Sequence, residues 1–547
     1  MKNTFLIFCL VVARVGLVSV VRAEAPQSDA QAGHAARSSA APARFPNILF
    51  IMSDDHATQA IGAYGGRLAA LGPTPVIDRL AREGMRLTNC FCTNAICTPS
   101  RAVTLTGQHA HVNGVKTLAD ALPPERQTLA HEMRRAGYET AVIGKWHLRE
   151  EPAAFDFYCV LPAQGHYFNP IFLARPDVQP LLPPSMQAEF PGRSATWPDN
   201  WFRAAAPSAL HADDAITDLS LKWLANRAQK DKPFFLMHHF KGPHDPFENP
   251  ERHDFLYDDT AIPEPESLRQ RGGHGPIGGP QYGTSVSKRN PRRNMGRHMR
   301  VDAELPESDY TTAAYQRYLK KYLRTARGVD DNVGRLVAHL KKTGQLDNTV
   351  IIYTSDQGMM LGEHDCIDKR WMYEESLQMP FMVRYPPEIP SGTTCDAIVS
   401  NIDFAPTILD YAGVPRPAGM QGRSVRPLLA GKPAPADWPD ATYYRYWMHM
   451  AHHEVPAHYG IRTADFKLIF FYGLPLDATG AVPTPTPPHW ELYDLRKDPQ
   501  EMLNVYRDPA YADTVEMLKA KLIAMKRDIG DDDAGYPEVI ARLEQTP

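Results

Sequence analysis

Two apolar runs of this 547-residue sequence are each followed by residues that could bind a divalent metal ion. Asp54 and Asp55 come directly after the run at residues 47–53, and adjacent carboxylates at a strand end repel each other unless a cation lies between them. Asp356 and Gln357 follow a later run and add a carboxylate and an amide oxygen, which are hard ligands suited to Ca²⁺ or Mg²⁺. The sequence therefore indicates an oxygen-ligated metal site. Aspartates that cap a helix or shape a turn are the alternative.

Lysines and histidines lie at comparable places in the chain. Lys145 and His147 follow one apolar run, Lys241 and His244 follow another, and Lys369 comes soon after the second acidic pair. A single histidine at a strand end is more often structural than catalytic. Two such histidines, each beside a lysine, favour a cationic pocket for a tetrahedral anion.

Cys97 begins the segment Cys-Thr-Pro-Ser-Arg, which ends at Arg101 and continues to Gly107. An isolated cysteine is most often a small, buried apolar residue. This segment, however, resembles the C-x-P-x-R signature of the type I sulfatases, in which a dedicated enzyme oxidises the cysteine to formylglycine (3-oxoalanine). The resemblance runs from residue 46 to residue 505 and includes the aspartate, lysine and histidine segments above.

The resemblance implies a fold, a cofactor and a set of ligands. The fold is α/β and alkaline-phosphatase-like, with a large, mixed, mostly parallel sheet flanked by helices and a smaller C-terminal domain that contains an antiparallel sheet and a helix. The cofactor is Ca²⁺, with Mg²⁺ as the alternative, and a formylglycine-generating enzyme modifies residue 97 during maturation. Five residues are implied as metal ligands: Asp54, Asp55, Cys97 in its modified form, Asp356 and Gln357.

The resemblance also implies how these residues hydrolyse a sulfate ester. The hydrated formylglycine at position 97 supplies the attacking hydroxyl. Three cationic side chains stabilise the anionic sulfuryl group: Arg101, Lys145 and Lys369. His244 protonates the departing alcohol, and His147 is the base that allows residue 97 to release sulfate.

Apolar runs that follow helix-like stretches repeat along the chain. A continuous run is typical of a strand buried on both faces of a sheet, and helix followed by strand predicts a doubly wound α/β sheet. The expected strands are at residues 47–53, 139–143, 233–238 and 348–353. The expected helices are at residues 127–136, 215–227, 310–342 and 512–527. The third of these is either two helices or one helix bent near Gly328. Ligands bind beyond the carboxyl ends of strands in such sheets, where the polar residues above fall.

Five regions are predicted along the chain. Residues 1–23 contain a lysine, an apolar stretch and a small-residue cleavage pattern, as in a secretory signal peptide, and residues 24–44 have too few large apolar residues to fold. The catalytic domain is expected at residues 45–436. Its basic, Gly/Pro-rich insertion at residues 263–300 is either a solvated loop or a rim that attracts an anionic substrate. Residues 437–547 form a C-terminal subdomain with short antiparallel strands and a helix.

The composition restricts the class of protein. Apolar residues make up 43% and charged residues 22% of the chain, with a mean hydropathy of -0.38, as in soluble globular proteins. The net charge of -4 is too balanced for non-specific binding to nucleic acid. Arg14 interrupts the N-terminal apolar run before it is long enough to span a bilayer. We therefore expect a secreted or periplasmic enzyme with no nucleic-acid partner and no stable membrane anchor.

The expected substrate class depends on the C-terminal aromatic segments. Residues 443–447, 452–453 and 458–462 most resemble bacterial sulfatases grouped near the N-acetylglucosamine-6-sulfatases and the mucin-desulfating enzymes. Their aromatic, histidine and arginine side chains could bind a sulfated sugar, or could pack a small sheet onto the main domain. We expect a sulfated carbohydrate, either N-acetylglucosamine-6-sulfate or a uronate-containing polysaccharide. Two other classes stay open: a phosphodiesterase or phosphonate hydrolase of the same superfamily, and a secreted glycan-binding protein without activity.

Overall fold

The computed structural model describes residues 45–192, 194, 201–227, 230–270, 282–287 and 299–546. The predicted signal peptide and linker both lie outside the described residues, as does most of the basic insertion. One compact unit runs from Ala43 to Pro547 and contains all the elements below. Within the described ranges, no helix combines the length and the apolar character that a membrane crossing requires.

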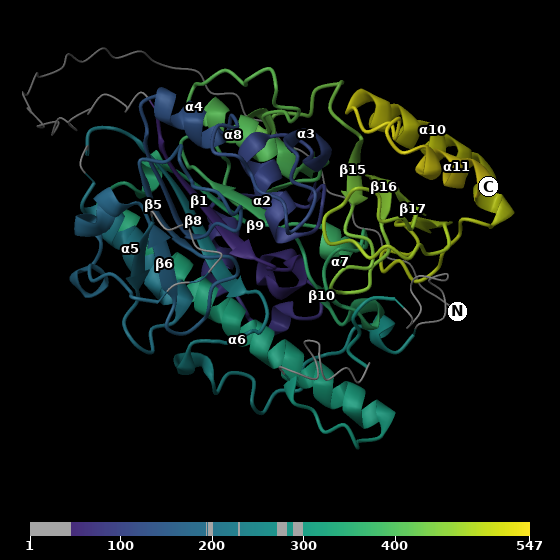
Figure 1. The fold of residues 1–547 in the computed structure, drawn as a ribbon, viewed down its shortest axis with the longest axis horizontal. Helices are drawn as coiled ribbons and strands as arrows, with labels where there is room; N and C mark the ends of the chain where they lie inside the picture. Colours follow the sequence, from purple (N-terminus) through teal and green to yellow (C-terminus); the bar gives the residue numbers. More distant parts are fainter. Residues whose placement is uncertain are drawn as a thin grey trace, which may run out of the picture. The chain divides into compact units, whose positions relative to one another are not determined.

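A ten-stranded sheet forms the centre of this unit (Figure 1). Its strands, from one edge to the other, are β13 (Thr393–Cys395), β2 (Met85–Leu87), β12 (Phe381–Arg384), β9 (Thr349–Ser355), β1 (Asn47–Asp54), β8 (Phe234–Pro243), β4 (Glu139–Lys145), β5 (Phe157–Leu161), β6 (Ile171–Ala174) and β7 (Phe202–Ala205). The five strands from β9 to β5 are parallel, whereas β12 and β6 run antiparallel to their neighbours β9 and β5. The predicted mixed, mostly parallel sheet is therefore confirmed.

Strand β1 shows why the central strands are apolar throughout. Side chains alternate between the two faces of a strand, and both faces of β1 are covered. Ile48, Phe50 and Met52 belong to the core on one face, while Leu49 and Ile51 belong to the core on the other. A strand with an exposed face would alternate apolar with polar residues, so the uninterrupted run predicted its central position.

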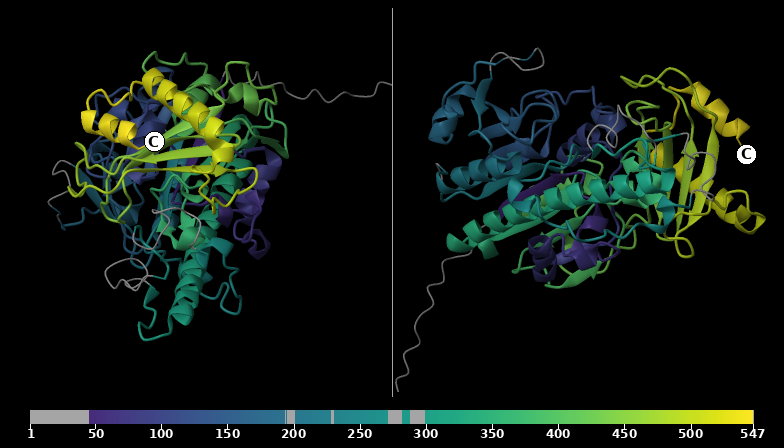
Figure 2. Two further views of the ribbon diagram at one scale, coloured as in Figure 1. Left: turned by 90° about the vertical axis from the view of Figure 1, so that its right-hand side faces the viewer. Right: turned by 90° about the horizontal axis from the view of Figure 1, so that it is seen from below.

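Helices cover both faces of the sheet (Figures 1 and 2). One layer consists of α1 (Pro75–Glu83), α5 (Ala212–Ala225) and α6 (Glu307–Lys342), and the other of α2 (Cys97–Thr106), α4 (Leu129–Arg135) and α8 (Phe404–Tyr411). The short helices are α3 (Ala110–Asn113), α7 (Glu374–Leu377) and α9 (Arg426–Leu429). The helices expected at residues 127–136 and 215–227 correspond to α4 and α5.

Helix α6 is a single helix of 36 residues, one of the two arrangements left open for residues 310–342. Its glycine, Gly328, has a packing explanation. A Cβ atom there would lie 3.0 Å from Cδ and Cγ of Pro250, so the absent side chain lets the loop at Pro250 pack against the helix.

A second, four-stranded antiparallel sheet follows the main one in the chain. Its strands are β15 (Ala441–Tyr446), β16 (His458–Thr463), β17 (Phe466–Phe471) and β18 (His489–Asp494), and its helices are α10 (Ala512–Asp528) and α11 (Pro537–Gln545). Tyr444 and Phe471 extend the core of the main sheet, whereas Tyr443 and Phe470 pack with Leu522 of α10. Figure 2 shows this sheet between the main sheet and α10. The sheet thus shares a core with the catalytic region on one face only.

Two pairs of very short strands lie outside these sheets: β3 (Cys90–Phe91) pairs with β14 (Val399–Ser400), and β10 (Met360–Leu361) pairs with β11 (Ile367–Asp368). The β10–β11 pair follows β9 directly and ends at Asp368, one residue before Lys369. It therefore folds this part of the chain back toward the carboxyl ends of the central strands.

Candidate active site

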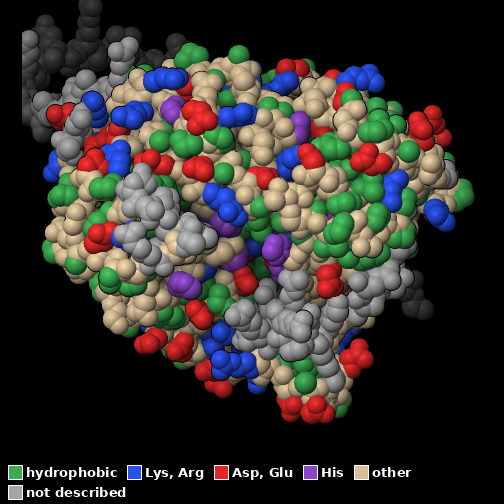
Figure 3. Space-filling view, in the orientation of Figure 1, with side chains coloured by type: hydrophobic (Ala, Val, Ile, Leu, Met, Phe, Trp, Pro, Cys, Tyr) green, Lys and Arg blue, Asp and Glu red, His purple; other side chains and the backbone are tan. Residues whose placement is uncertain are grey.

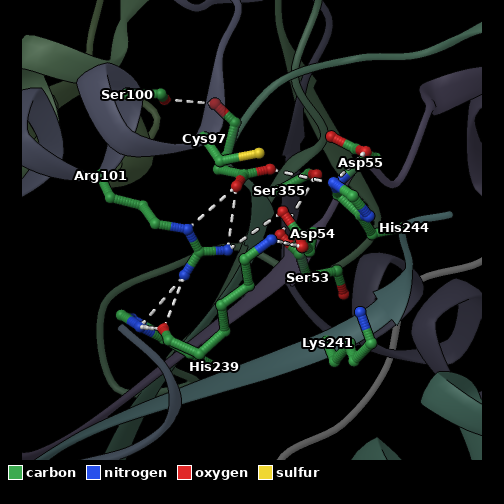
Figure 4. A network of polar contacts seen from close by, with 12 residues as sticks. Ser53, Asp54, Asp55, Cys97, Ser100, Arg101, His239, Lys241, His244 and Ser355 are labelled. Atoms are coloured by element: carbon green, nitrogen blue, oxygen red, sulfur yellow. Dashed lines mark hydrogen bonds and ion pairs between the residues drawn. The ribbon is translucent and has the colours of Figure 1, made fainter. Parts of the chain in front are cut away.

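The carboxyl ends of β1, β9, β4 and β8 bring together the predicted polar residues. Ser53 of β1 is aligned with Ser355 of β9, and Asp54 with Pro243 at the end of β8. Parallel strands that start in register end at the same edge of the sheet, so the residues that follow them meet there. Figure 4 shows the result, with side chains from separate strands and from α2 directed toward one another.

Three buried carboxylates form the centre of the site. Oxygens of Asp54, Asp55 and Asp356 all lie within 4.8 Å of one another. Burial, followed by the negative charge of Asp54, raises the pKa of Asp356 to about 8. Burial also raises the pKa of Asp54, but Lys145 and the other nearby cations lower it by more, so it lies well below its usual value. Carboxylates this close are unstable as a charged group unless positive charge lies among them.

Gln357 completes a donor set that fits a hard cation. Its Nε2 donates a hydrogen bond to Asp55 Oδ1 and lies 3.9 Å from Cys97 Sγ. Its Oε1 is buried and accepts no hydrogen bond from any residue that the structure describes. Buried amide oxygens are normally satisfied, so this one suits a ligand position. Three carboxylates and an amide oxygen are the ligand types that Ca²⁺ and Mg²⁺ prefer.

Cys97 is the first residue of α2 and faces the carboxylates. Its Sγ and ligand atoms of Asp54 and His244 lie within 4.8 Å of one another. Burial, with the charge of Asp54, raises the pKa of the thiol to about 12. Pro99 is tolerated because it lies in the first turn of the helix, where its missing N–H removes no intrahelical bond. The first turn of α2 therefore directs residue 97 toward Asp54, one of the candidate metal ligands.

Ser100 attaches this turn of α2 to β9. Its hydroxyl donates to the backbone carbonyl of Asp356 and accepts a hydrogen bond of 2.9 Å from Asn401 Nδ2. All three residues are fully buried or nearly so. The distance between residue 97 and Asp356 is thus held by a contact between segments about 250 residues apart in sequence.

Arg101 lies beside the carboxylates and contacts two of them. Its Nε donates to Asp356 Oδ2 at 3.0 Å, one terminal nitrogen lies 3.5 Å from Asp54 Oδ1, and the other donates to the Lys145 carbonyl at 2.8 Å. The side chain is almost fully buried. These contacts hold the carboxylates in place. The role that the resemblance implies for Arg101, stabilising the sulfuryl group, stays a prediction.

Two buried lysines approach the same carboxylates from other elements. Lys145 Nζ contacts Asp54 Oδ2 and lies 2.6 Å from Gln164 Oε1. Lys369 Nζ contacts Asp55 Oδ2. Burial lowers the pKa of Lys369, but Asp55 and further negative charges raise it by more, so it lies well above its usual value. The Lys369 ammonium group therefore remains charged beside residue 97.

The two predicted histidines differ in their surroundings. His244 Nδ1 lies 2.6 Å from Asp245 Oδ1, and its Nε2 lies 3.6 Å from Asp55 Oδ2. His147 has no hydrogen-bond partner for Nδ1 within the described residues. Burial and the positive charge of Lys145 lower the pKa of His147 well below its usual value. His147 is thus a neutral imidazole near the lysine, and His244 is oriented by its neighbour.

The site contains further residues that the sequence analysis did not name as catalytic residues or metal ligands. His239 Nδ1 lies 2.9 Å from the Lys145 carbonyl, and Lys241 Nζ lies 4.5 Å from the centre of the Tyr167 ring. Burial and Lys145 lower the pKa of Lys241 to about 8. Lys241 lies in the same segment as His244, so its place near the site could be predicted from the sequence. Gln164 lies in a loop with no local pattern to mark it.

A polar rim lies beside Lys369. Asp368 forms an ion pair with Arg370, and His453 Nε2 lies 3.5 Å from Asp368 Oδ1. His453 Nδ1 lies 2.9 Å from Thr284 Oγ1. Figure 3 shows a hollow on this face of the molecule in which histidine side chains gather. Residues from three distant segments thus place hydrogen-bonding groups next to the lysine.

The other aromatic segments considered for sugar binding pack into the protein. His458 is fully buried, with its ring centre 4.7 Å from that of Phe471 and 5.5 Å from that of Tyr444. Arg462 pairs with Glu374 at 3.2 Å and its guanidinium lies over the Phe91 ring. For these residues, packing of the small sheet onto the main domain is the correct interpretation.

A protein-family model described as Sulfatase matches residues 46–414. The chain belongs to the sulfatase family. A second model, described as N-sulphoglucosamine sulphohydrolase, C-terminal, matches residues 362–528 of this sulfatase. The resemblance drawn from the C-x-P-x-R segment is thereby confirmed, and with it the activity class of a sulfuric ester hydrolase.

Relatives of known structure or name agree with this sulfatase assignment. An N-acetylglucosamine-6-O-sulfatase of Bacteroides thetaiotaomicron is 38% identical over 537 residues, covering 90% of this chain and 88% of the relative. A protein solved in complex with its substrate D-glucosamine-2-N,6-O-disulfate superposes with a TM-score of 0.76 and 36% identity, covering 90% of this chain and 99% of the other. The alkaline-phosphatase-like sulfatase fold is thereby confirmed.

A phosphonate monoester hydrolase from Silicibacter pomeroyi also has this fold. Its TM-score is 0.64 at 25% identity, and the match covers 89% of this chain and 97% of the hydrolase. The fold alone therefore does not separate sulfate esters from phosphorus esters, and the argument for substrate must come from the site.

Proposed function

We propose that this sulfatase removes a 6-O-sulfate from a glucosamine-containing glycan, using formylglycine at position 97 and a bound Ca²⁺. One observation supports the mechanism: residue 97, at the start of α2, lies beside Asp54 and His244, and Asp54 in turn lies beside Asp55 and Asp356. The substrate follows from the 38% identical N-acetylglucosamine-6-O-sulfatase and from the 36% identical protein bound to a glucosamine disulfate.

The charges around residue 97 support an anionic substrate. Three carboxylates are balanced by three cationic side chains, Arg101, Lys145 and Lys369. A divalent ion held by Asp54, Asp55, Asp356 and Gln357 would give the site an excess of two positive charges, which attracts the singly negative sulfate ester. Such an ion supplies Lewis-acid polarisation of a sulfate oxygen. Magnesium is the alternative ion.

The side chains of the chain itself then have distinct roles. With a cation held by Asp54 and Asp55, Lys145 and Lys369 would be free to donate to the sulfuryl oxygens. Arg101 keeps the carboxylates in position. His244, whose Nδ1 faces Asp245, presents Nε2 to protonate the leaving oxygen. His147, neutral and without a partner for Nδ1 among the described residues, accepts a proton when sulfate is released.

Conversion of Cys97 to formylglycine is the second part of the proposal. The hydrated aldehyde offers two hydroxyls, one to attack sulfur and one to expel sulfate afterwards, whereas a serine or an unmodified cysteine has no second hydroxyl. A formylglycine-generating enzyme of the host is the implied partner. Peptide mass spectrometry of active enzyme is expected to show the aldehyde or its hydrate at position 97. A fully active preparation with only the free thiol would refute this mechanism.

The glycan is proposed to reach Lys369 across the polar rim. Asp368, Arg370 and His453 offer both donors and acceptors to sugar hydroxyls, as a carbohydrate site requires. The test is a screen of position-defined sulfated sugars, read as sulfate release. N-acetylglucosamine-6-sulfate is expected to be hydrolysed faster than its 3-sulfate isomer and faster than an aryl phosphodiester. A dominant phosphodiester rate would reverse the assignment in favour of phosphorus esters, and sugar binding without release would favour a glycan-binding protein.

We also propose that the enzyme is secreted or periplasmic, because residues 1–23 have the pattern of a signal peptide. The measurement is the N-terminal sequence of the protein recovered from cell fractions. Recovery of an intact residue 1 in the cytosolic fraction would exclude export.

A further inference from the structure

The turn that carries Asp55 is held by distant residues. Asp55 has a φ of 66°, a left-handed conformation that an aspartate adopts only at a cost and that needs support from its surroundings. Its N–H donates to Asp356 Oδ1 at 3.1 Å, and the N–H of His56 donates to Ser355 Oγ at 2.8 Å. The carbonyl of Asp55 and the N–H of Ala57 are two further backbone groups of the same turn.

The hydroxyl of Tyr322 satisfies both of these groups. It donates to the Asp55 carbonyl at 2.6 Å and accepts from the Ala57 N–H at 2.8 Å. Tyr322 is on α6, is fully buried, and has its ring centre 5.9 Å from that of Phe247 and 6.3 Å from that of Tyr318. One hydroxyl thus bridges the turn, and the ring that carries it is fixed by packing.

The same helix provides a comparison. Tyr315 and Tyr318 also direct their hydroxyls at backbone carbonyls, those of Pro263 at 2.5 Å and of Met360 at 2.9 Å. Neither of these contacts involves the turn at Asp55. All three tyrosines donate a hydrogen bond to a backbone carbonyl from one helix, and Tyr322 in addition accepts one from the Ala57 N–H.

We propose that Tyr322 is a positioning residue for the metal site, fixing the backbone of Asp55 so that its carboxylate faces Lys369, Gln357 and a bound cation. The inference rests on the metal site of the proposed function. Without the hydroxyl, the Asp55 carbonyl and the Ala57 N–H are left unsatisfied in the interior, and the turn relaxes away from the left-handed conformation. The Asp55 carboxylate then moves with its backbone. Residues that orient metal ligands typically change metal affinity or activity by about 10- to 100-fold when they are lost.

The test compares Tyr322→Phe with Tyr315→Phe, each of which removes one hydroxyl and keeps the ring. Calcium is titrated into the metal-stripped full-length proteins by calorimetry, and thermal midpoints are recorded in EDTA. Tyr322→Phe is expected to bind Ca²⁺ about 10-fold or more weakly. Tyr315→Phe is expected to keep the wild-type affinity within about twofold, with a comparable change in thermal midpoint. Saturating Ca²⁺ is expected to restore part of the turnover of Tyr322→Phe.

Unchanged affinity in Tyr322→Phe, or an equal loss in Tyr315→Phe, would overturn the inference. Wild-type protein that binds neither Ca²⁺ nor Mg²⁺ would instead overturn the proposed metal site, so the two failures are distinct. If Tyr322→Phe does not fold, hydrogen exchange at the Ala57 amide of the metal-stripped wild-type protein tests whether Tyr322 holds the turn. Protection is expected because the bond to Tyr322 exists before metal binds, and rapid exchange there contradicts it.

Discussion

Among the buried clusters of opposite charges in the described part of the chain, the one at the active site and one near the C-terminal sheet differ in the groups that surround the charges. In the catalytic cluster, Asp54, Asp55 and Asp356 face Arg101, Lys145 and Lys369 at the edge of the main sheet. In the C-terminal cluster, Lys467 lies 2.9 Å from Glu374 and 2.6 Å from Glu501, and Arg462 lies 3.2 Å from Glu374. Both clusters balance their formal charges.

The difference lies in the groups around the charges. The catalytic cluster adds the Gln357 amide oxygen, unpartnered among the described residues, a histidine oriented by Asp245, and residue 97 at a helix start. The C-terminal cluster joins α7, β16, β17 and the segment after β18, and its cations are taken up by the glutamates. Ion pairs of this second kind hold elements together. The first cluster also contains a reactive residue and an oriented histidine, which is why we propose that it binds an ion and a substrate.

The largest effect is expected from Cys97→Ala, which removes the reacting side chain. Loss of a nucleophile costs on the order of 10⁶-fold in turnover. Sulfate release from N-acetylglucosamine-6-sulfate measures it, with circular dichroism as the control for folding. Residual activity within about tenfold of wild type would show that residue 97 is not the nucleophile.

The second-largest effect is expected from Lys467→Ala, which tests whether the C-terminal cluster contributes to stability rather than to activity. Lys467→Ala leaves Glu374 and Glu501 buried with less compensation, and breaking a buried ion pair in this way costs about 3–5 kcal/mol. Urea unfolding is expected to show this loss in the free energy of unfolding. Activity per folded molecule is expected to stay within about twofold of wild type, since Lys467 contacts neither residue 97 nor its ligands. A stable but inactive variant would remove the distinction between the clusters.

Lys369→Ala is expected to lose turnover while keeping its stability, the opposite of Lys467→Ala. Its partner Asp55 keeps Gln357 and a bound cation, so the calcium-loaded protein is expected to unfold within about 1 kcal/mol of wild type. Turnover is expected to fall about 10²- to 10³-fold, the usual cost of removing one group that stabilises developing negative charge. Steady-state kinetics with saturating Ca²⁺ measure this. A large loss of stability with little loss of turnover would assign Lys369 to structure.

The smallest effect concerns pH and the C-terminal cluster. Burial is the main cause that raises the pKa of Glu501 from its ordinary 4.5 to about 7. The positive charge of Lys467 lowers this pKa, and the negative charge of Glu374 raises it. The folded protein therefore binds more protons than the unfolded chain between these values, and stability falls as pH rises from about 4.5 to 7. Glu501→Gln removes this contribution. Its free energy of unfolding, compared with wild type, is expected to improve by about 1–3 kcal/mol from pH 4.5 to pH 7.5. A pH-independent difference between the two proteins would contradict the shift.

Much of the fold was readable from local patterns. The apolar runs at residues 47–53, 139–143, 233–238 and 348–353 became β1, β4, β8 and β9, because strands covered on both faces need apolar side chains throughout. The single helix over Glu307–Lys342 could not be distinguished from two helices, because Gly328 is explained only by the approach of Pro250.

For the site, too, the sequence predicted the reactive residues but not their contacts. The structure brings together all ten residues singled out for catalysis or metal binding, and the segment around Cys97 marked the family. Local patterns did not show that Arg101 would contact Asp54 and Asp356, nor that His458 would lie in the core while His453 approaches Asp368. Residue type gives the chemistry that a side chain can perform, and its direction depends on which distant segment packs beside it.

The sequence by itself determined which strands are buried, where their carboxyl ends fall and which reactive groups follow them, because these depend on residues close together in the chain. Only the tertiary structure decided how those groups are held. The bridge from Tyr322 to the turn at Asp55 spans 267 positions, and that from Ser100 to Asp356 spans 256. Contacts at such separations depend on the packing of whole helices against the sheet, which no local pattern of residues encodes.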